Sequence, residues 1–196
     1  MNTKIVKQKI LAEMLTHDES LLNLIKMAKQ KTLQELLMND EWEMMKLEEV
    51  CDTISSKPYQ IFQSEILENG KIPVISQSAD FIEGYSNIVE KVLKITKPIV
   101  IFGDHTRNVK FIDFDFIIGA DGVKILVPKD IITPKFHYYF VLFASENIEN
   151  RGYSRHFQYL SKFEIHLPPL PVQQQIVEKI DAVFAQLEII EKTISK

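Results

Sequence analysis

The side chains of this sequence that could bind a ligand lie in polar runs between apolar segments. The run 103–110 falls between two β-prone stretches and offers arginine, asparagine, histidine and threonine, which hydrogen-bond to base edges in DNA. The run 151–159 mixes arginines with aromatic rings, which suits contact with phosphates and bases. A weaker candidate lies at 76–78. The candidate nucleic-acid contacts are Ser76, Gln77, Ser78, His105, Thr106, Arg107, Asn108, Lys110, Arg155, His156 and Gln158.

Both main runs also have a structural interpretation. The run 103–110 could be a solvated loop that connects two strands. In the run 151–159, the rings of Tyr153, Phe157 and Tyr159 could belong to the core, with the arginine stems lying along the surface. The sequence leaves these alternatives open.

Residues arranged as a catalytic centre are few. The sequence has no glycine-rich phosphate loop and no G-x-G-x-x-G, so we expect no nucleotide or S-adenosylmethionine site in this chain. Carboxylates such as Asp104 and Asp121 could hold Mg²⁺ in a nuclease, but Asp121-Gly122 is typical of a turn that leads into a strand. The histidines are scattered, and Cys51 has no local His–Asp pair that would make it a nucleophile. We therefore expect neither catalysis nor a metal site.

The charge balance is acidic, with 23 Lys and Arg against 27 Asp and Glu. A domain that binds DNA unaided is usually basic, because neutralised phosphates supply most of its non-specific affinity. A role on DNA would therefore need a local positive face or a partner that supplies the backbone contacts. The single cysteine fits a reducing cytoplasm. We expect no signal peptide and no membrane span, because the sequence does not open on an apolar stretch of the signal-peptide type and has no apolar run of roughly 18 residues.

The sequence predicts a helix at the C-terminal end, directly after the domain that contains these polar runs. The proline run at 167–171 predicts extended chain, and Pro171 suits the first turn of a helix. The apolar residues that follow are spaced 4, 3, 4, 3 and 4 apart, which is the spacing of a coiled-coil seam. The seam is under three heptads long and needs a helical partner. The expected interface residues are Ile176, Ile180, Val183, Leu187, Ile190 and Ile194, together with Leu22 and Ile25.

The first forty residues predict helix in two pieces. The break is expected at Thr16-His17-Asp18-Glu19, which has the pattern of a capping box, and Asn39-Asp40 ends the second piece. This helical arm could pair with the C-terminal helix, in the same chain or in a second one. The alternative is a helix that packs only on its own domain.

The middle of the chain predicts an irregular, mostly β domain. Its β-prone runs lie between Gly, Pro, Asn and Asp, and they are 73–75, 99–102, 109–112, 116–118 and 123–127. The segment 136–147 predicts a buried helix. The expected fold class is α+β, with a helical arm at 1–40, the domain at 41–170, and a dimerising or spacing coiled-coil helix at 171–196.

Three groups of residues resemble type I restriction–modification specificity (S) subunits. The run Leu167–Asp181 resembles their domain-to-helix junction, where an LPPLxxQ motif and an apolar helix end each target recognition domain. The run Glu41–Cys51 resembles the entrance of that domain, although Glu48 stands where glycine is common. The runs 101–106, 119–122 and 155–160 are similar to its interior. The resemblance covers the chain from about residue 20 onward.

The resemblance implies a function and a set of partners. S subunits usually carry two recognition domains, and this chain has room for one, so it looks like a half-length S subunit. Such a subunit reads one half-site of double-stranded DNA, and as a homodimer it requires an inverted-repeat target. The family also implies a non-catalytic role beside modification subunits, which bind S-adenosylmethionine and methylate adenine, with or without a restriction subunit.

Two other hypotheses remain. The acidic charge is compatible with a coiled-coil adaptor or inhibitor that binds protein rather than DNA. The weakest hypothesis is a metal-dependent nuclease that uses Asp104 or Asp121.

Overall fold

The computed structural model describes the backbone of residues 3–119, 121–149, 152 and 154–194, with side chains from residue 19 onward. Arg151 and Tyr153 of the second polar run lie outside the described residues. The helices of this part are α1 (Thr3–Leu37), α2 (Leu47–Val50), α3 (Pro134–Asn147), α4 (Phe157–Leu160) and α5 (Leu170–Ile194), with 3₁₀ turns η1 (Lys57–Tyr59), η2 (Gln63–Glu65) and η3 (Val89–Lys91). The strands are β1 (Glu43–Lys46), β2 (Cys51–Ile54), β3 (Ile72–Ile75), β4 (Gly84–Ser86), β5 (Ile99–Gly103), β6 (Val109–Ile112), β7 (Ile117–Ile118), β8 (Val123–Pro128) and β9 (Glu164–Leu167).

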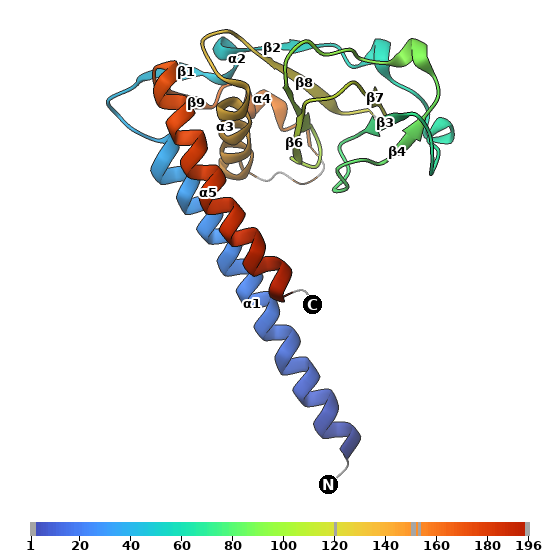
Figure 1. Ribbon diagram of the computed structural model, residues 1–196, viewed down its shortest axis with the longest axis vertical. Helices are drawn as coiled ribbons and strands as arrows, with labels where there is room; N and C mark the ends of the chain where they lie inside the picture. Colours follow the sequence, from blue (N-terminus) through green and yellow to red (C-terminus); the bar gives the residue numbers. More distant parts are fainter. Residues whose placement is uncertain (1–2, 120, 150–151, 153, 195–196) are drawn as a thin grey trace.

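An antiparallel sheet in the order β2-β8-β5-β6 forms the centre of the domain (Figure 1). All five residues of β5 are buried, and Ile101 lies opposite Ile125 of β8. A smaller sheet in the order β4-β3-β7 lies at the far end of the domain, and β1 pairs with β9 near the helices. The β-prone runs therefore form the strands that the sequence predicted. The short strands β1, β2, β4 and β9 were not predicted, because each is half exposed and lacks a continuous apolar run.

The helix α3 covers the central sheet and confirms the predicted buried helix. Pro134 occupies its first turn, where the missing N–H costs nothing. Phe136, Phe140 and Tyr139 are almost completely buried in the main core. This core also includes Leu33 and Leu37 of α1 and joins the domain to the helical arm. The observed architecture is α+β, as predicted.

The arm consists of α1 and α5 side by side in one chain (Figure 1). The ammonium of Lys29 pairs with the carboxylate of Glu191 at 3.1 Å. The predicted break at Thr16–Glu19 is wrong, because α1 runs through these residues as one helix. Threonine and aspartate in a helix interior cost only a few tenths of a kcal/mol each, so a capping pattern alone does not end a helix.

The heptad seam of α5 is divided between two surfaces. Ile176 and Ile180 are buried in the domain's own core, whereas Val183 and Leu187 are half-buried and Ile190 is 49% exposed. Ile194 is half-buried near the end of the helix. On α1, Ile25 is 7% exposed and Leu22 is 37% exposed. The proximal half of the predicted seam therefore packs in the core that the domain shares with α1, and the distal half stays partly exposed, since spacing alone does not show what a seam packs against.

Within the described residues, no helix is both long enough and apolar enough to cross a membrane.

Candidate nucleic-acid interface

Gln77 joins the first polar loop to two other segments. Its side-chain oxygen accepts from the N–H of His105 at 3.2 Å, and its Nε2 donates to the carbonyl of Asp121 at 2.9 Å. Its backbone carbonyl accepts from Thr106 Oγ1 at 2.7 Å and from Asn108 Nδ2 at 2.9 Å. The loop after β3, the loop between β5 and β6 and the turn before β8 therefore meet at one place.

Asp104 joins the second polar run to the same place. Its carboxylate is buried, accepts from the N–H of Phe157 at 2.8 Å and pairs with Lys124 at 3.6 Å. Its backbone carbonyl accepts from the N–H of His156 at 2.9 Å. The ring of His156 also contacts this carbonyl at 3.0 Å. The two polar runs, which lie about 50 residues apart in the sequence, are thus held together by one aspartate.

A hollow of about 480 Å³ lies where these loops meet. Its lining includes the cations Lys57, Lys124 and Arg155 and the carboxylates of Asp104 and Asp121. The ammonium of Lys124 forms an ion pair with Asp104, and its Nζ lies 5.3 Å from the ring centre of Phe157. Within the described chain, Lys57 and Arg155 make no ion pair. This local surface offers two unpaired cations on an otherwise acidic domain, which suits contact with phosphates.

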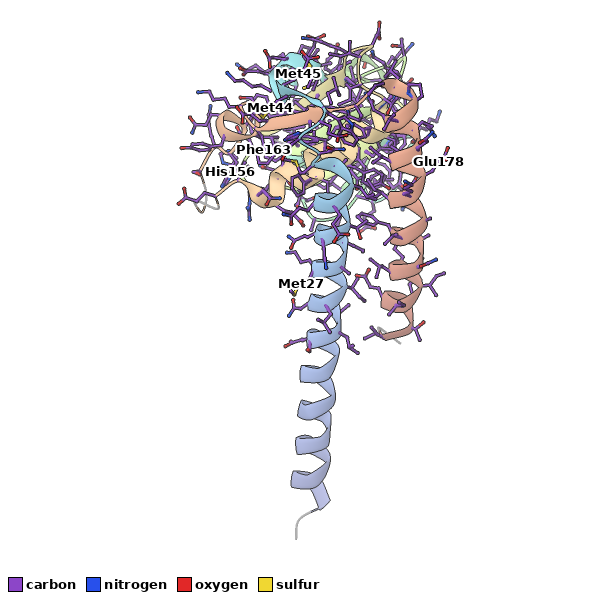
Figure 2. The ribbon with its side chains drawn as sticks, turned by 90° about the vertical axis from the view of Figure 1, so that its left-hand side faces the viewer. Met27, Met44, Met45, His156, Phe163 and Glu178 are labelled. Atoms are coloured by element: carbon purple, nitrogen blue, oxygen red, sulfur yellow. The ribbon has the colours of Figure 1, made fainter. Side chains whose placement is uncertain are left out.

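Several predicted contact residues hold the loops from inside. Ser76 and His156 are almost completely buried, and the Lys110 ammonium is buried and donates to the carbonyl of Asp80. Burial lowers the pKa of Lys110, although the carboxylates of Glu83 and Asp80 oppose this effect. His156 lies on the side of the domain away from α5 (Figure 2). The structure therefore gives these three side chains contacts within the protein.

Arg107 also has a structural contact. Its guanidinium donates to the carbonyls of Ser145 and Ile148, at 3.4 and 3.3 Å, where α3 ends. A cation near the last carbonyls of a helix is favourable because these groups carry a partial negative charge. Arg107 also has φ 61°, a left-handed conformation that is uncommon for residues other than glycine. The loop therefore fixes the backbone of Arg107, and the end of α3 holds its side chain.

The remaining predicted residues present polar atoms at the surface. Thr106, Arg155 and Gln158 are exposed, and Gln77, Ser78, His105 and Asn108 are partly exposed. A groove of about 380 Å³ separates this loop from Lys26 and Gln30 of α1, so the arm lies beside the candidate interface.

The sequence singled out neither Lys57 nor Lys124 as a DNA-binding residue. Neither has a local motif, because each comes to the hollow from an ordinary turn or strand. The preference for Asp121-Gly122 as a turn before a strand is confirmed by β8, and Gly122 has φ 78°. Among the described residues, no group of three or more His, Cys, Asp or Glu could hold a metal ion. The buried carboxylate of Asp104 instead serves as a loop anchor.

A family model for the type I restriction modification DNA specificity domain matches residues 39–196. The chain belongs to the type I restriction–modification specificity family. Proteins of this family are non-catalytic specificity subunits. One relative is the specificity subunit of the Escherichia coli type I restriction enzyme EcoR124I/EcoR124II, which is 25% identical over 154 residues. The matched part is 72% of this chain and 38% of that protein.

Solved specificity subunits have the same fold. The HsdS subunit from Thermoanaerobacter tengcongensis superimposes with a TM-score of 0.63 at 18% identity, over 95% of this chain and 52% of that one. The type I S subunit from M. genitalium also gives a TM-score of 0.63, at 16% identity, over 95% of this chain and 55% of that one. This specificity chain therefore spans about half the length of the solved subunits, and it carries one recognition domain.

Proposed function

We propose that this chain reads one half-site of a bipartite DNA target and scaffolds adenine methyltransferase subunits. It does so as a homodimer on an inverted repeat in the cytoplasm, without catalytic activity and without a cofactor of its own. The S-adenosylmethionine belongs to the modification subunit. The proposal holds with or without a restriction subunit.

The convergence of the polar loops supports the DNA-reading part of the proposal. Gln77 and Asp104 bring together segments that are far apart in the sequence. The side chains of Thr106 and Arg155 stay exposed and that of Asn108 stays partly exposed, with Thr106 and Asn108 held in place by the carbonyl of Gln77. Amide and hydroxyl groups on a supported loop can read base edges, while Arg155 and Lys57 can contact phosphates. The buried and anchored members of the cluster, such as Lys110 and Arg107, keep the loop in shape.

The acidic charge of the chain supports the need for a partner on DNA. The net charge is −4, so phosphate contacts from this chain alone would be few. Modification subunits that surround the DNA would supply the remaining contacts. The local pair of cations then needs only to place the reading loops in a groove.

The arm supports the dimer. Apolar side chains stay exposed where α5 ends, and Leu24, Met27 and Ile189 are 57%, 63% and 66% exposed. Figure 2 shows Met27 on the side of α1 that faces away from α5. Beyond the end of α5, α1 continues alone (Figure 1) for roughly 30 Å at 1.5 Å per residue. A second copy of the arm would cover these surfaces, and the helices would then act as a ruler between two recognition domains.

The test is a methylome. The chain is expressed with its neighbouring modification subunit in a host without DNA methylation, and the modified bases are sequenced. We expect adenine methylation at a split inverted repeat, since a two-fold dimer reads the same half-site twice. A control co-expression omits this chain and should give no methylation.

Other outcomes would change the proposal. An asymmetric motif would replace the homodimer with a pair of different recognition domains. Absence of methylation, with both proteins soluble and associated, would contradict DNA reading. Tight protein binding without salt-sensitive retention of DNA would then favour the adaptor or inhibitor hypothesis.

A further inference from the structure

The junction between the domain and α5 contains a fully buried glutamine. Gln173 has no exposed surface and lies in the first turn of α5. Its side-chain oxygen accepts from the N–H of Thr133 at 2.7 Å. Its Nε2 donates to the carbonyls of Ile131 and Pro168, at 3.0 and 2.9 Å. One amide thus satisfies backbone groups from the loop before α3 and from the proline run.

These three bonds fix α5 in a way that its apolar contacts do not. Ile176, Val177 and Ile180 are buried against the domain, but burial of apolar surface has no preferred direction and permits small rolls and slides of a helix. Hydrogen bonds weaken steeply when their angles change. An amide that serves three backbone groups therefore allows one axial position and one rotation of the helix. Further along, Asp181 accepts from Tyr139 and pairs with Lys135, which holds the next two turns to α3.

A small error at this junction grows along the arm. Glu191, which pairs with α1, lies 18 residues beyond Gln173, or about 27 Å along the helix. A tilt of about 10° at the junction would move that point by about 5 Å, which exceeds the rise of one base pair, about 3.4 Å. An arm that sets the distance between two half-sites therefore needs a junction that prevents a tilt of this size.

We propose that Gln173 is a positioning residue that fixes the angle between the arm and the recognition domain, and thereby restricts the distance between the two half-sites that a dimer accepts. This inference rests on the proposed function for its effect on DNA. Its effect on the arm angle does not depend on that function.

The chain offers a matched control, because three glutamines follow one another. Gln174 and Gln175 are exposed, and Gln174 bonds only to Glu178 of the same helix. We compare Gln173→Leu with Gln174→Leu in the full chain. A second control, Ile118→Val, loses a methyl group in a separate buried cluster and lowers the melting temperature without touching the junction.

The first measurement is the distance between spin labels on the domain and on the arm, at cysteines introduced in place of Asp113 and Lys192. Both positions are exposed. Cys51 needs no replacement, because it is buried and burial raises the pKa of its thiol to about 12. We expect a narrow distance distribution in wild type, Gln174→Leu and Ile118→Val, and a broader or shifted one in Gln173→Leu. An unchanged distribution in a folded Gln173→Leu would overturn the inference.

The second measurement is the spacer length in the methylome. We expect Gln173→Leu to keep the half-site sequence. The ratio of methylation at the original spacer length to methylation at neighbouring lengths should fall about fivefold. A spacer preference equal to that of wild type would overturn the role on DNA. If the wild-type complex methylates nothing, the proposed function fails, and the distance distributions still decide the role of Gln173. Should Gln173→Leu fail to fold, Gln173→Met and Gln173→Glu replace it in both measurements.

Discussion

Single residues in the loop cluster divide into those that hold the loops and those that face solvent. The first group satisfies backbone N–H and carbonyl groups and consists of Gln77, Asp104 and Lys110. A backbone group that is removed from water without a hydrogen-bond partner would lower the stability of the fold. Arg155 lies outside this framework with an exposed side chain. A change in the first group should affect stability, and a change in the second should affect binding.

Arg107 belongs to the first group. We expect Arg107→Ala to lower the free energy of unfolding by about 1 kcal/mol, because two bonds to the end of α3 are lost. Arg107→Gly should be more stable than Arg107→Ala by about 1 kcal/mol, because glycine accepts φ 61° without strain. Urea unfolding of the three proteins measures both differences.

The outcome that contradicts a structural role for Arg107 is specific. An arginine that reads a guanine with both nitrogens would lose about 1–3 kcal/mol of binding on one sequence when it is replaced. Unchanged stability together with a relaxed methylation motif in Arg107→Ala would therefore assign the residue to base recognition.

Arg155 belongs to the second group. We expect Arg155→Ala to weaken DNA binding of the complex on all sequences, and to reduce the slope of log K against log salt by about 1, because one phosphate contact is lost. Salt titrations on target and non-target duplexes measure this. Lys71→Ala removes the same charge from an exposed position outside the loop cluster and should leave the slope unchanged. A loss confined to the target sequence would indicate a base contact instead.

Among the elements, α3 connects the reading loops to the arm. Its N-terminal end contacts Gln173 through Thr133, its C-terminal end receives Arg107, and its middle packs against the central sheet. Most residues of α3 are buried or half-buried, because the helix packs against β5 and β6 and also against α1 and α5. It nevertheless contains His137, which is fully buried and whose ring nitrogens find no hydrogen-bond partner among the described residues.

The burial of His137 predicts a loss of stability in mild acid. Burial lowers the pKa of His137 from 6.5 to about 3 in the folded chain. Between these values the unfolded chain binds more protons, so the stability is complete above pH 6.5 and decreases as the pH falls towards 3. From pH 7 to 5 this group should cost about 2 kcal/mol.

Two variants measure the contribution of His137. His137→Leu replaces the imidazole with an apolar side chain of similar size that does not titrate. The free energy of unfolding of this variant should therefore change less between pH 7 and 5 than that of wild type. Phe140→Leu, in the same helix, should lose similar stability at both values because it removes no titrating group. An equal pH dependence of wild type and His137→Leu would contradict the prediction.

The whole molecule combines a recognition domain with an arm that is only partly covered. The domain buries the first half of α5, and α1 covers much of the second half. Because α1 and α5 run antiparallel and Lys29 pairs with Glu191, Ile189 and Ile190 lie level with about residues 30–31 of α1. The exposed side chains of Met27, Leu24 and Leu22 lie about one to two turns farther from the domain. Such a patch on a long helix pair is typical of a surface that another helix covers.

The arm patch predicts a dimer that a single charge should weaken. Ile190→Glu places a carboxylate in this patch and should raise the dimer dissociation constant by about tenfold or more, because a charge without a partner is costly to bury. Sedimentation over a range of concentrations, with and without the modification subunit, measures the dissociation constant. Gln186→Glu adds the same charge at another exposed position of α5 and should have a smaller effect. A wild-type chain that stays monomeric in both conditions would contradict the dimer.

The sequence by itself determined the order of the main elements and the family. Strand-forming runs such as 99–102 and 123–127 consist of residues that favour a buried strand in almost any context, and the proline run with its heptad seam forces a helix to leave the domain. Those local preferences depend on neighbours within a few positions. The composition of the runs 76–78 and 103–110 also made them candidate contact segments, whereas the bonds of Gln77 to His105 and Thr106 came from the structure.

Only the tertiary structure decided which polar residues hold the loops and which face solvent. Arg107 and Arg155 are chemically alike in the sequence, yet one caps α3 and the other is exposed at the hollow. The three consecutive glutamines at 173–175 differ in the same way, since only the first meets the carbonyls of Ile131 and Pro168. Apart from the contact with Pro168, burial and hydrogen bonding here depend on residues about 40 positions away, which no local pattern of side chains specifies.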